Sequence, residues 1–393
     1  MTQRAIALVD GEHYAPVVRD ALAALPYDVV GALLVGGTEK LRGDDDYGAP
    51  LVEALDSVEA DVVVDLSDEP VLGPRERMLW ASRALALGLP YVGADFRFDP
   101  PPFQPIETPS LAVIGLGKRI GKTAVAGHVA RVLARERRVV VVAMGRGGPA
   151  EPELVEAAPT LEDLLALSRS GRHAASDHLE AAVLSGVPAI GCRRAGGGLA
   201  GAPFESNVLE GAALAGQLDP ELLVLDGSGA ALPPVEADAR ILVANGGHDP
   251  RAGLNAYRVL VSDLVVDTGG ADREAIRSIS AVPVVGAELR LRPVHPLRGR
   301  RTAVFTTGPA PTEGLDAQIV HVSRNLAHRD ALREELERVD AEVYLVELKA
   351  AAVDVVAEAA LACGAEVILA ANDVVSDELD ERVLSLVPDR SRA

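Results

Sequence analysis

A glycine-rich stretch after the first quarter of the chain holds the residues best suited to chemistry. Residues 115–123 read GLGKRIGKT, between the apolar run Leu111–Ile114 and a helical pattern that extends from Lys122 to about Arg135. A strand, a glycine turn and a helix in this order direct backbone N–H groups and a helix N-terminus at phosphate oxygens. The pattern predicts that Lys122 contacts the β- and γ-phosphates of ATP and that the hydroxyl of Thr123 binds Mg²⁺.

The spacing of this stretch departs from the commonest phosphate-binding loop. Leu116 stands five positions before Gly121, where a glycine is expected, and glycines flank it on both sides. Lys118 and Arg119 add two cations, as in several phosphotransferase and synthetase branches of the P-loop proteins. We assign nucleotide binding to Gly115, Gly117, Gly121, Lys122 and Thr123. The predicted catalytic residues are Lys118, Arg119, Lys122 and Asp226.

An acidic partner for the metal is expected at the end of another core strand. Asp226 follows the apolar run Leu222–Leu225 and precedes Gly227, so we predict that it binds Mg²⁺ directly or through water. A strand-end Asp-Gly turn with no ligand is the alternative interpretation of Asp226. Asp267, after Leu264–Val266, is a weaker candidate for the same role.

Two glycine-rich loops carry arginines that suit an anionic substrate. Arg146 lies in MGRGGP at residues 144–149, and Arg193 and Arg194 lie in CRRAGGGLAG at residues 192–201. Glycines let the backbone approach a ligand, and the guanidinium group matches a phosphate or a carboxylate. We therefore predict that the three arginines bind substrate. Exposed surface charge is the alternative interpretation of the adjacent pair.

Two further groups of polar residues are predicted to contact substrate. Ser206 and Asn207 begin a predicted helix, so they either cap it or bind substrate. Asp10, Glu12 and His13 follow the first predicted strand, at the carboxyl edge where open α/β sheets bind ligands. A single histidine at such a position is more often structural. Residues 36–40 and 67–69 follow the next predicted strands at the same edge, and the three segments together outline a second site.

The elements that position these residues follow an alternating pattern. Short β-branched runs alternate with helical patterns throughout, which predicts an α/β fold with mainly parallel sheets. We predict an N-terminal Rossmann-like α/β domain over 1–99, a proline-rich linker over 100–107, a P-loop domain over 108–298 and an α/β C-terminal segment over 299–393. The basic stretch Arg290–Arg301 marks the last boundary, and the final segment either forms its own domain or completes the central sheet. The predicted strands are Ala5–Val9, Val29–Val35, Asp61–Leu66, Tyr91–Val92, Leu111–Ile114, Arg138–Met144, Pro188–Ile190, Leu222–Leu225, Arg240–Ala244, Leu264–Val266, Pro283–Val285, Ala303–Thr306, Gln318–Val322, Glu342–Val346 and Glu366–Ala370.

Composition narrows the classes of function. The net charge of −20 argues against a general nucleic-acid or anionic-membrane binder, because such partners need a basic face. Cys192 and Cys363 lack metal-ligand spacing and are expected to be ordinary thiols in a reducing compartment. The sequence has neither a secretory signal pattern nor an apolar run of about 20 residues, so we expect a soluble, cytoplasmic protein. Nothing in it resembles a metal cluster, a nucleophile elbow or a Cys–His pair.

The motifs in their order resemble the cyclic 2,3-diphosphoglycerate synthetase family, best known from thermophilic methanogens. The resemblance rests on VDGEHY at 9–14, the loop at 115–123, MGRGGP at 144–149, residues 193–201 and PFESN at 203–207. It covers nearly the whole chain in the same order of domains. It implies ATP- and Mg²⁺-dependent closure of 2,3-diphosphoglycerate to the cyclic anhydride, with release of ADP and phosphate, by a homodimer.

The residues fit a mechanism that needs cations more than an acid or a base. The substrate carries a charge of roughly −4 to −5 at neutral pH, so its phosphates repel each other. ATP would phosphorylate one substrate phosphate, the neighbouring phosphate would attack it, and inorganic phosphate would leave. One alternative is a P-loop kinase or ligase that acts on another small anionic metabolite, which a substrate panel distinguishes. The other is a nucleotide-switched partner protein of the partitioning-ATPase kind, which hydrolyses ATP slowly without a small substrate.

Overall fold

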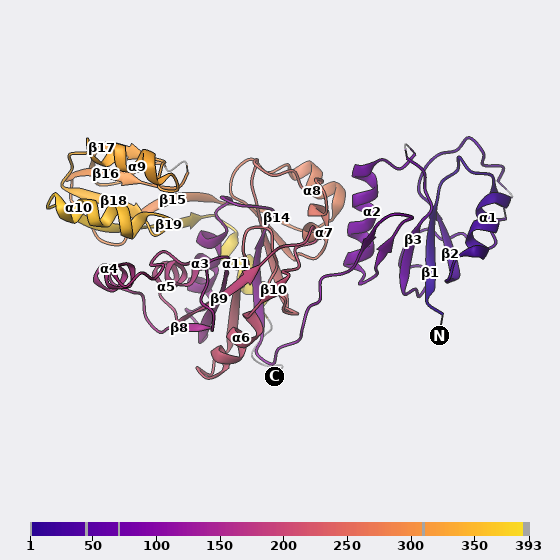
Figure 1. The fold of residues 1–393 in the computed structure, drawn as a ribbon, viewed down its shortest axis with the longest axis horizontal. Helices are drawn as coiled ribbons and strands as arrows, with labels where there is room; N and C mark the ends of the chain where they lie inside the picture. The colour runs from indigo at the N-terminus through magenta and orange to yellow at the C-terminus, as the bar shows by residue number, and fades with distance from the viewer. Residues whose placement is uncertain (1, 44–45, 70, 309–310, 388–393) are drawn as a thin grey trace. The chain divides into compact units, whose positions relative to one another are not determined.

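The computed structural model describes residues 2–43, 46–69, 71–308 and 311–387 of an α/β protein with three mainly parallel sheets (Figure 1). The predicted fold class is confirmed. The chain forms two compact units, and each unit is built from three separate segments of the sequence. The first unit comprises Met1–Pro102, Asp249–Val261 and Asp272–Val282, and the second comprises Phe103–His248, Ser262–Ala271 and Pro283–Ala393. Within the described residues, no helix is long and apolar enough to cross a membrane.

The first unit is built on a five-stranded sheet of order β2-β1-β3-β4-β5, parallel except for β5. The side chains of residues 5–9 in β1 are all buried, as expected for a strand covered on both faces. Helix α7 (Asn255–Leu260) packs against α2 and α8 (Arg273–Ile279), so helices that follow strands of the central sheet belong to this unit. Its other elements are β1 (Arg4–Val9), α1 (Ala15–Ala24), β2 (Asp28–Leu34), β3 (Val62–Asp65), α2 (Pro74–Ala86), β4 (Tyr91–Val92) and β5 (Arg97–Phe98).

The second unit contains the central sheet, in which eight strands follow the order β10-β9-β7-β11-β6-β12-β13-β14 and β8 pairs with β9. All pairs are parallel except those that β8 and β10 make with β9. The strands are β6 (Ser110–Gly115), β7 (Val139–Gly145), β8 (Glu153–Val155), β9 (Ala189–Ala195), β10 (Glu205–Ser206), β11 (Leu222–Asp226), β12 (Ala239–Ala244), β13 (Leu264–Asp267) and β14 (Val284–Gly286). The helices are α3 (Lys122–Leu133), α4 (Leu161–Arg169), α5 (Asp177–Ser185) and α6 (Val208–Gly216).

The same unit contains a third sheet of order β15-β19-β18-β16-β17, in which β15 runs antiparallel to β19. The prediction that residues 290–301 form a boundary stretch misses β15, because its alternation of arginine and leucine is a strand pattern with one exposed face. The elements are β15 (Glu288–Pro293), β16 (Arg301–Phe305), β17 (Gln318–Ser323), α9 (Arg329–Leu336), β18 (Val343–Glu347), the π-helix η1 (Ala352–Ala357), α10 (Glu358–Ala362), β19 (Glu366–Val375) and α11 (Leu379–Leu386).

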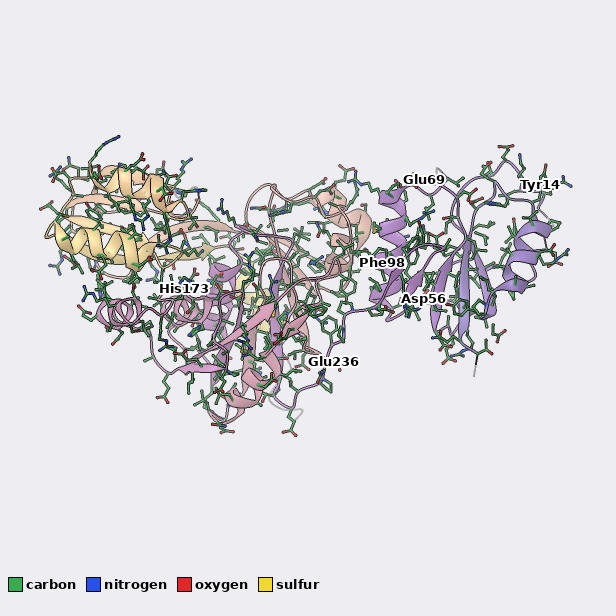
Figure 2. All side chains as sticks on the ribbon, in the orientation of Figure 1. Tyr14, Asp56, Glu69, Phe98, His173 and Glu236 are labelled. Carbon is green, nitrogen blue, oxygen red and sulfur yellow. The ribbon has the colours of Figure 1, made fainter. Side chains whose placement is uncertain are left out.

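Two shared cores join the third sheet to the central one. Leu164 and Leu179, from α4 and α5, pack in one core with Phe305 and Val346 of the third sheet. Helix α11 in turn packs on α3 in the core of the central sheet. The final segment therefore makes a sheet of its own within one compact unit, and the predicted division into 1–99, 108–298 and 299–393 stays a prediction. Figure 2 shows the side chains, with His173 labelled in the turn between α4 and α5.

Candidate active site

The loop between β6 and α3 is shaped by backbone that favours glycine. Gly121 caps α3 in the left-handed region with a φ of +78°, and Arg119 lies there too with a φ of +59°. A Cβ at Gly115 would approach the Ile120 side chain to 2.5 Å, and one at Gly117 would meet the ring of His248. Within the described residues, no hydrogen bond engages the backbone N–H groups of residues 117–121. These donors, next to a helix N-terminus, form a cradle for an anion.

Lys122 and Asp226 form a buried ion pair behind this loop. The Nζ of Lys122 donates to Oδ1 of Asp226, and the carboxylate is almost fully buried. Asp226 ends β11, where it pairs with Val113 of β6 and Ala143 of β7 at the carboxyl edge of the sheet. Burial raises the pKa of Asp226, while the Lys122 ammonium opposes that shift. Lys122 must therefore leave this partner, or share it, to reach a phosphate.

The weaker aspartate candidate has a local role. Oδ1 of Asp267 accepts hydrogen bonds from the backbone N–H groups of Gly269 and Ala271, which shape the turn after β13. Its carboxylate is buried and it does not line the cleft described next.

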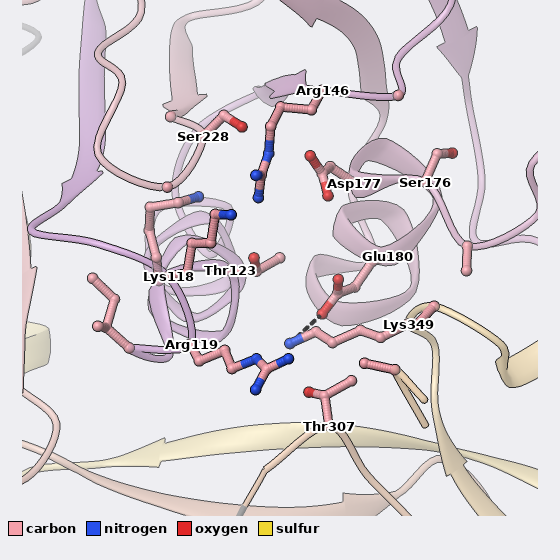
Figure 3. Close-up of a pocket in the computed structure, with 18 of the residues that line it drawn as sticks. Lys118, Arg119, Thr123, Arg146, Ser176, Asp177, Glu180, Ser228, Thr307 and Lys349 are labelled. Atoms are coloured by element: carbon pink, nitrogen blue, oxygen red, sulfur yellow. Dashed lines mark ion pairs between the residues drawn. The ribbon is translucent and has the colours of Figure 1, made fainter. Parts of the chain in front are cut away.

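The loop opens into a cleft of about 490 Å³ (Figure 3). Among the described residues that line it, five are Lys or Arg and two are Asp or Glu, in a chain of net charge −20. Figure 3 shows that the charged ends of Lys118, Arg119 and Arg146 point into the cleft, beside the hydroxyl of Thr123. Within the described part of the chain, no hydrogen bond or ion pair engages those three cationic groups. The cleft therefore offers positive charge to an incoming anion. The charged lining residues are Lys118, Arg119, Lys122, Arg146, Lys349, Asp177 and Glu180.

The loop after β7 needs its glycines to pack. A Cβ at Gly148 would lie 2.0 Å from the carbonyl oxygen of Cys192, and one at Gly145 would lie 2.7 Å from a carboxylate oxygen of Asp177. The first contact is with rigid backbone, so only glycine fits there without displacement of β9. This close packing holds the exposed Arg146 at the mouth of the cleft.

The two adjacent arginines lie on a strand, where a loop was predicted. Strand β9 continues to Ala195 and pairs with β10, so the side chains of Arg193 and Arg194 point to opposite faces. Arg193 lies 3.8 Å from Glu205, and Arg194 donates to the carbonyl groups of Gly196 and Ser228. Neither arginine lines the cleft among its described residues. The sequence pattern missed this because three glycines follow the pair and suggest a loop.

Ser206 and Asn207 tie loops together at the start of α6. The Asn207 side chain accepts from the backbone N–H of Arg193 at 2.7 Å and donates to the carbonyl groups of Pro149 and Ala150. Ser206 Oγ accepts from the N–H of Val208 at 3.3 Å. Asn207 thereby links the loop that carries Arg146 to β9, and both side chains lie outside the lining of the cleft.

Asp10, Glu12 and His13 belong to the other unit, where their side chains bind one another and nearby backbone. Asp10 accepts from Nδ1 of His13 at 2.8 Å and from the backbone N–H groups of Glu12 and Asp68. Glu12 accepts from two N–H groups of the next strand-end loop. Burial acts to raise the pKa of Asp10, but these hydrogen bonds outweigh it and the pKa lies below its ordinary value. Their role in substrate binding stays a prediction.

The cleft also contains residues that the sequence patterns did not single out, among them two carboxylates, a threonine and a lysine. Asp177 and Glu180 lie in the first turn of α5, and Thr307 and Lys349 follow β16 and β18. Thr307 stands directly after a predicted strand and Lys349 follows another by three residues, so the rule that drew attention to Asp10 would have found them. Lys349 was also visible as one of only four lysines in the chain.

Glu180 and Lys349 form an ion pair on the wall of the cleft opposite the loop cations (Figure 3). The Nζ of Lys349 lies 3.2 Å from Oε1 of Glu180. Burial raises the pKa of Glu180 to about 7 in spite of the lysine. The Glu180 carboxylate in turn raises the pKa of Lys349, so this lysine stays protonated.

Comparison with known proteins covers almost the whole chain. Three family models match, described as the N-terminal domain, the P-loop domain and the C-terminal domain of cyclic 2,3-diphosphoglycerate synthetase, over residues 4–99, 110–282 and 293–373. A protein of Rubrobacter xylanophilus with that name is 48% identical over 98% of this chain and 97% of its own length. Proteins of the same name from Thermococcus kodakarensis (97% of this chain, 98% of the relative) and Methanothermus fervidus (98% and 97%) are 42% and 37% identical.

Proposed function

This chain belongs to the cyclic 2,3-diphosphoglycerate synthetase family, and from that premise we propose that it closes 2,3-diphosphoglycerate to its cyclic anhydride with ATP. The observation that carries the proposal is the cleft itself. Three cations of the loops around it, Lys118, Arg119 and Arg146, point into the cleft, and no hydrogen bond or ion pair engages their charged groups among the described residues. A substrate with two phosphates and a carboxylate supplies the anionic groups that such a cleft can bind.

Nucleotide binding falls to the loop of residues 115–123. The N–H groups of the loop and the N-terminus of α3 would hold the β- and γ-phosphates, and Lys122 would turn from Asp226 toward the γ-phosphate. The Asp226 carboxylate stays in place during this movement, because it is buried. It can then attract Lys122 back after ADP leaves. The pair thus holds the Lys122 side chain in one position in the free protein.

The residues present also fit a magnesium ion. Thr123 offers its hydroxyl to the cleft, and a carboxylate is available from Asp177, which lines it, or from Asp226 behind it. A protein that supplies one or two ligands and leaves the others to phosphates and water is typical of Mg²⁺. When bound, the ion would supply positive charge to the phosphates of ATP. We propose Asp226 as the carboxylate ligand of the ion, and Asp177 is the alternative carboxylate to test.

The reaction needs two phosphoryl transfers. In the first, an oxygen of one substrate phosphate attacks the γ-phosphorus, the bond to the β-phosphate breaks, and ADP leaves. In the second, an oxygen of the other substrate phosphate attacks the phosphorus that was activated, and inorganic phosphate leaves. Lys118, Arg119 and Arg146 would neutralise the anions that must come together. Enforced proximity of the two groups can contribute on the order of 7–11 kcal/mol to the second step.

We also propose an oligomeric state, a location and further substrate contacts for this chain. We retain a homodimer and a cytoplasmic location, which the family resemblance and the sequence pattern suggested. The substrate-binding roles of Arg193, Arg194, Ser206 and Asn207 require these side chains to exchange their present backbone or ion-pair partners for substrate.

The proposal is tested by mixing the purified chain with ATP, Mg²⁺ and 2,3-diphosphoglycerate and following the reaction by ³¹P NMR. We expect ADP, inorganic phosphate and the signals of a cyclic anhydride to rise together. ADP formation without the cyclic signals would refute cyclisation. A panel of other phosphorylated acids in the same assay then separates this reaction from that of a kinase or ligase for another anion.

A further inference from the structure

The third sheet has a topology that creates a ligand crevice at its carboxyl edge. Strands β16 and β18 are parallel neighbours, and the chain leaves them in opposite directions, to β17 on one side and toward β19 on the other. In open α/β sheets such a switch point is where ligands bind. Thr307 follows β16 and Lys349 follows β18, and both line the cleft that also contains the phosphate loop.

Partly buried contacts hold the strand ends beside these two residues. Glu347, at the end of β18, accepts from the N–H of Thr307 at 3.0 Å and from Nδ2 of Asn372 at 2.9 Å, so it links the end of β18 to the loop after β16 and to β19. Ala350, next to Lys349, has a φ of +48°, a strained conformation for a residue with a Cβ. The π-helix η1 begins two residues later. Strained backbone of this kind is found where a side chain must be held in one direction.

The choice of lysine at position 349 is informative in this chain. The sequence has four lysines against 34 arginines, and three of the four lysines, at 118, 122 and 349, line the cleft. Lysine is a compact charge on a flexible stem, so it can move between partners, whereas arginine forms a fixed fork. Lys349 has such a partner in Glu180, at 3.2 Å. After burial, the carboxylates of Asp177 and Glu347 also repel that of Glu180 and help to raise its pKa.

We propose that Lys349 and Thr307 form a phosphate subsite on the third sheet, and that Glu180 holds Lys349 until a substrate phosphate replaces it. This inference rests on the proposed function, because it assigns the subsite to the substrate phosphate that does not receive the γ-phosphoryl group. The phosphate loop and its cations occupy one wall of the cleft, and Lys349 reaches in from the opposite wall (Figure 3). The ammonium, and the hydroxyl of Thr307 once it turns from Glu347, then hold the attacking phosphate toward the activated one, against the repulsion between them.

The test compares Lys349→Met with wild type in the full chain. Met has a length similar to that of Lys but carries no charge. As a matched control, Arg333→Met removes an exposed charge from helix α9, between β17 and β18 in the chain. We expect the KM for 2,3-diphosphoglycerate to rise at least tenfold in the Lys349 variant, with the KM for ATP within threefold of wild type. Lys349→Arg should recover part of that loss. An unchanged KM for the substrate, or an equal rise for ATP, overturns the subsite.

Binding of inorganic pyrophosphate separates this inference from the proposed function. Calorimetry with the loop saturated by Mg²⁺ and a non-hydrolysable ATP analogue measures the subsite without turnover. If wild type makes no cyclic product, the proposed function fails, and the subsite stands only if pyrophosphate binds at least tenfold more weakly to the Lys349→Met chain. Should that variant not fold, as judged by circular dichroism, Thr307→Val replaces it. Equal binding by wild type and Thr307→Val then contradicts the proposal.

Discussion

At the carboxyl edge of the N-terminal sheet, Asp10 accepts three hydrogen bonds and Glu12 accepts two, all from the loops of that edge. At the carboxyl edge of the central sheet, Lys118, Arg119 and Arg146 surround a cleft, and no hydrogen bond or ion pair engages them within the described residues. Both sets follow parallel strands in the sequence. The polar residues of the first edge bind its own loops, whereas those of the second are available to a ligand.

The difference shows that position at a strand end does not by itself identify a binding residue. A buried carboxylate that already accepts several hydrogen bonds loses them when it turns to a ligand, and each lost bond costs about 1–3 kcal/mol. An exposed cation beside a glycine loop carries no such cost. The cleft also contains intermediate cases, Lys122 and Lys349, each paired with one buried carboxylate. The predictions below test this distinction from its strongest case to its weakest.

Lys122→Ala should produce the largest effect. It removes the cation aimed along the phosphate loop, and we expect cyclic product formation to fall by roughly 10³-fold or more. The rate is measured by ³¹P NMR with ATP in excess, and Arg333→Ala, on the exposed face of α9, is the control. Activity within tenfold of wild type would show that the nucleotide is bound elsewhere.

Arg146, in the loop after β7, and Arg193, on β9, offer a matched comparison. Arg146→Met should lower kcat/KM for 2,3-diphosphoglycerate by roughly 10²-fold, because Arg146 faces the cleft. Arg193→Met should lower it by less than tenfold, because Arg193 lies near Glu205 and must leave it to reach a substrate. The kcat/KM values of both variants are measured from steady-state ADP release, with the concentrations of ATP and 2,3-diphosphoglycerate varied. Equal losses would mean that Arg193 turns to the substrate after all.

The pH dependence of substrate binding should distinguish the paired lysine from the unpaired cations. Glu180 has a raised pKa of about 7, so below that pH it is protonated and releases Lys349, and above it the carboxylate competes with substrate phosphate. The KM for 2,3-diphosphoglycerate in wild type should therefore rise by up to about tenfold from pH 6 to pH 8, relative to Glu180→Gln. The ratio of the KM values of the two proteins at each pH removes the effect of substrate ionisation, which is the same for both.

A stability measurement checks the same group independently. Because the pKa of Glu180 is higher in the folded chain than in the unfolded one, its contribution to stability is present at low pH and is lost as pH rises toward 7. The melting temperature of wild type should fall over that range relative to Glu180→Gln. A constant difference between the two melting curves from pH 5 to pH 8 would contradict the raised pKa.

The sequence predicted the site unevenly, for identifiable reasons. The phosphate loop was predictable because its function depends on local backbone, which the glycines at 115, 117 and 121 specify within one short segment. The pair at 193 and 194 was placed in a loop because glycines outweighed the strand pattern, and pairing of β9 with β10 reverses that preference. Lys349 could not be joined to the loop from sequence, since more than 200 residues separate them and packing of the third sheet on the central unit brings them together.

Asp10→Asn should have the smallest effect on the reaction and a clear effect on stability. The hydrogen bonds to Asp10 hold its pKa below the ordinary value, so its contribution to stability is present above the pKa of the unfolded chain and is lost as pH falls through the folded value. At pH 7 we expect the variant to lose about 1–3 kcal/mol from the N-terminal unit, because the amide cannot accept as well as the carboxylate. The KM for 2,3-diphosphoglycerate should stay within threefold of wild type. Hydrogen exchange of the strands around Asp10 measures the first effect and ADP release the second. A tenfold rise in KM with unchanged exchange would instead place Asp10 at the substrate, and the contrast between the two sheet edges would then fail.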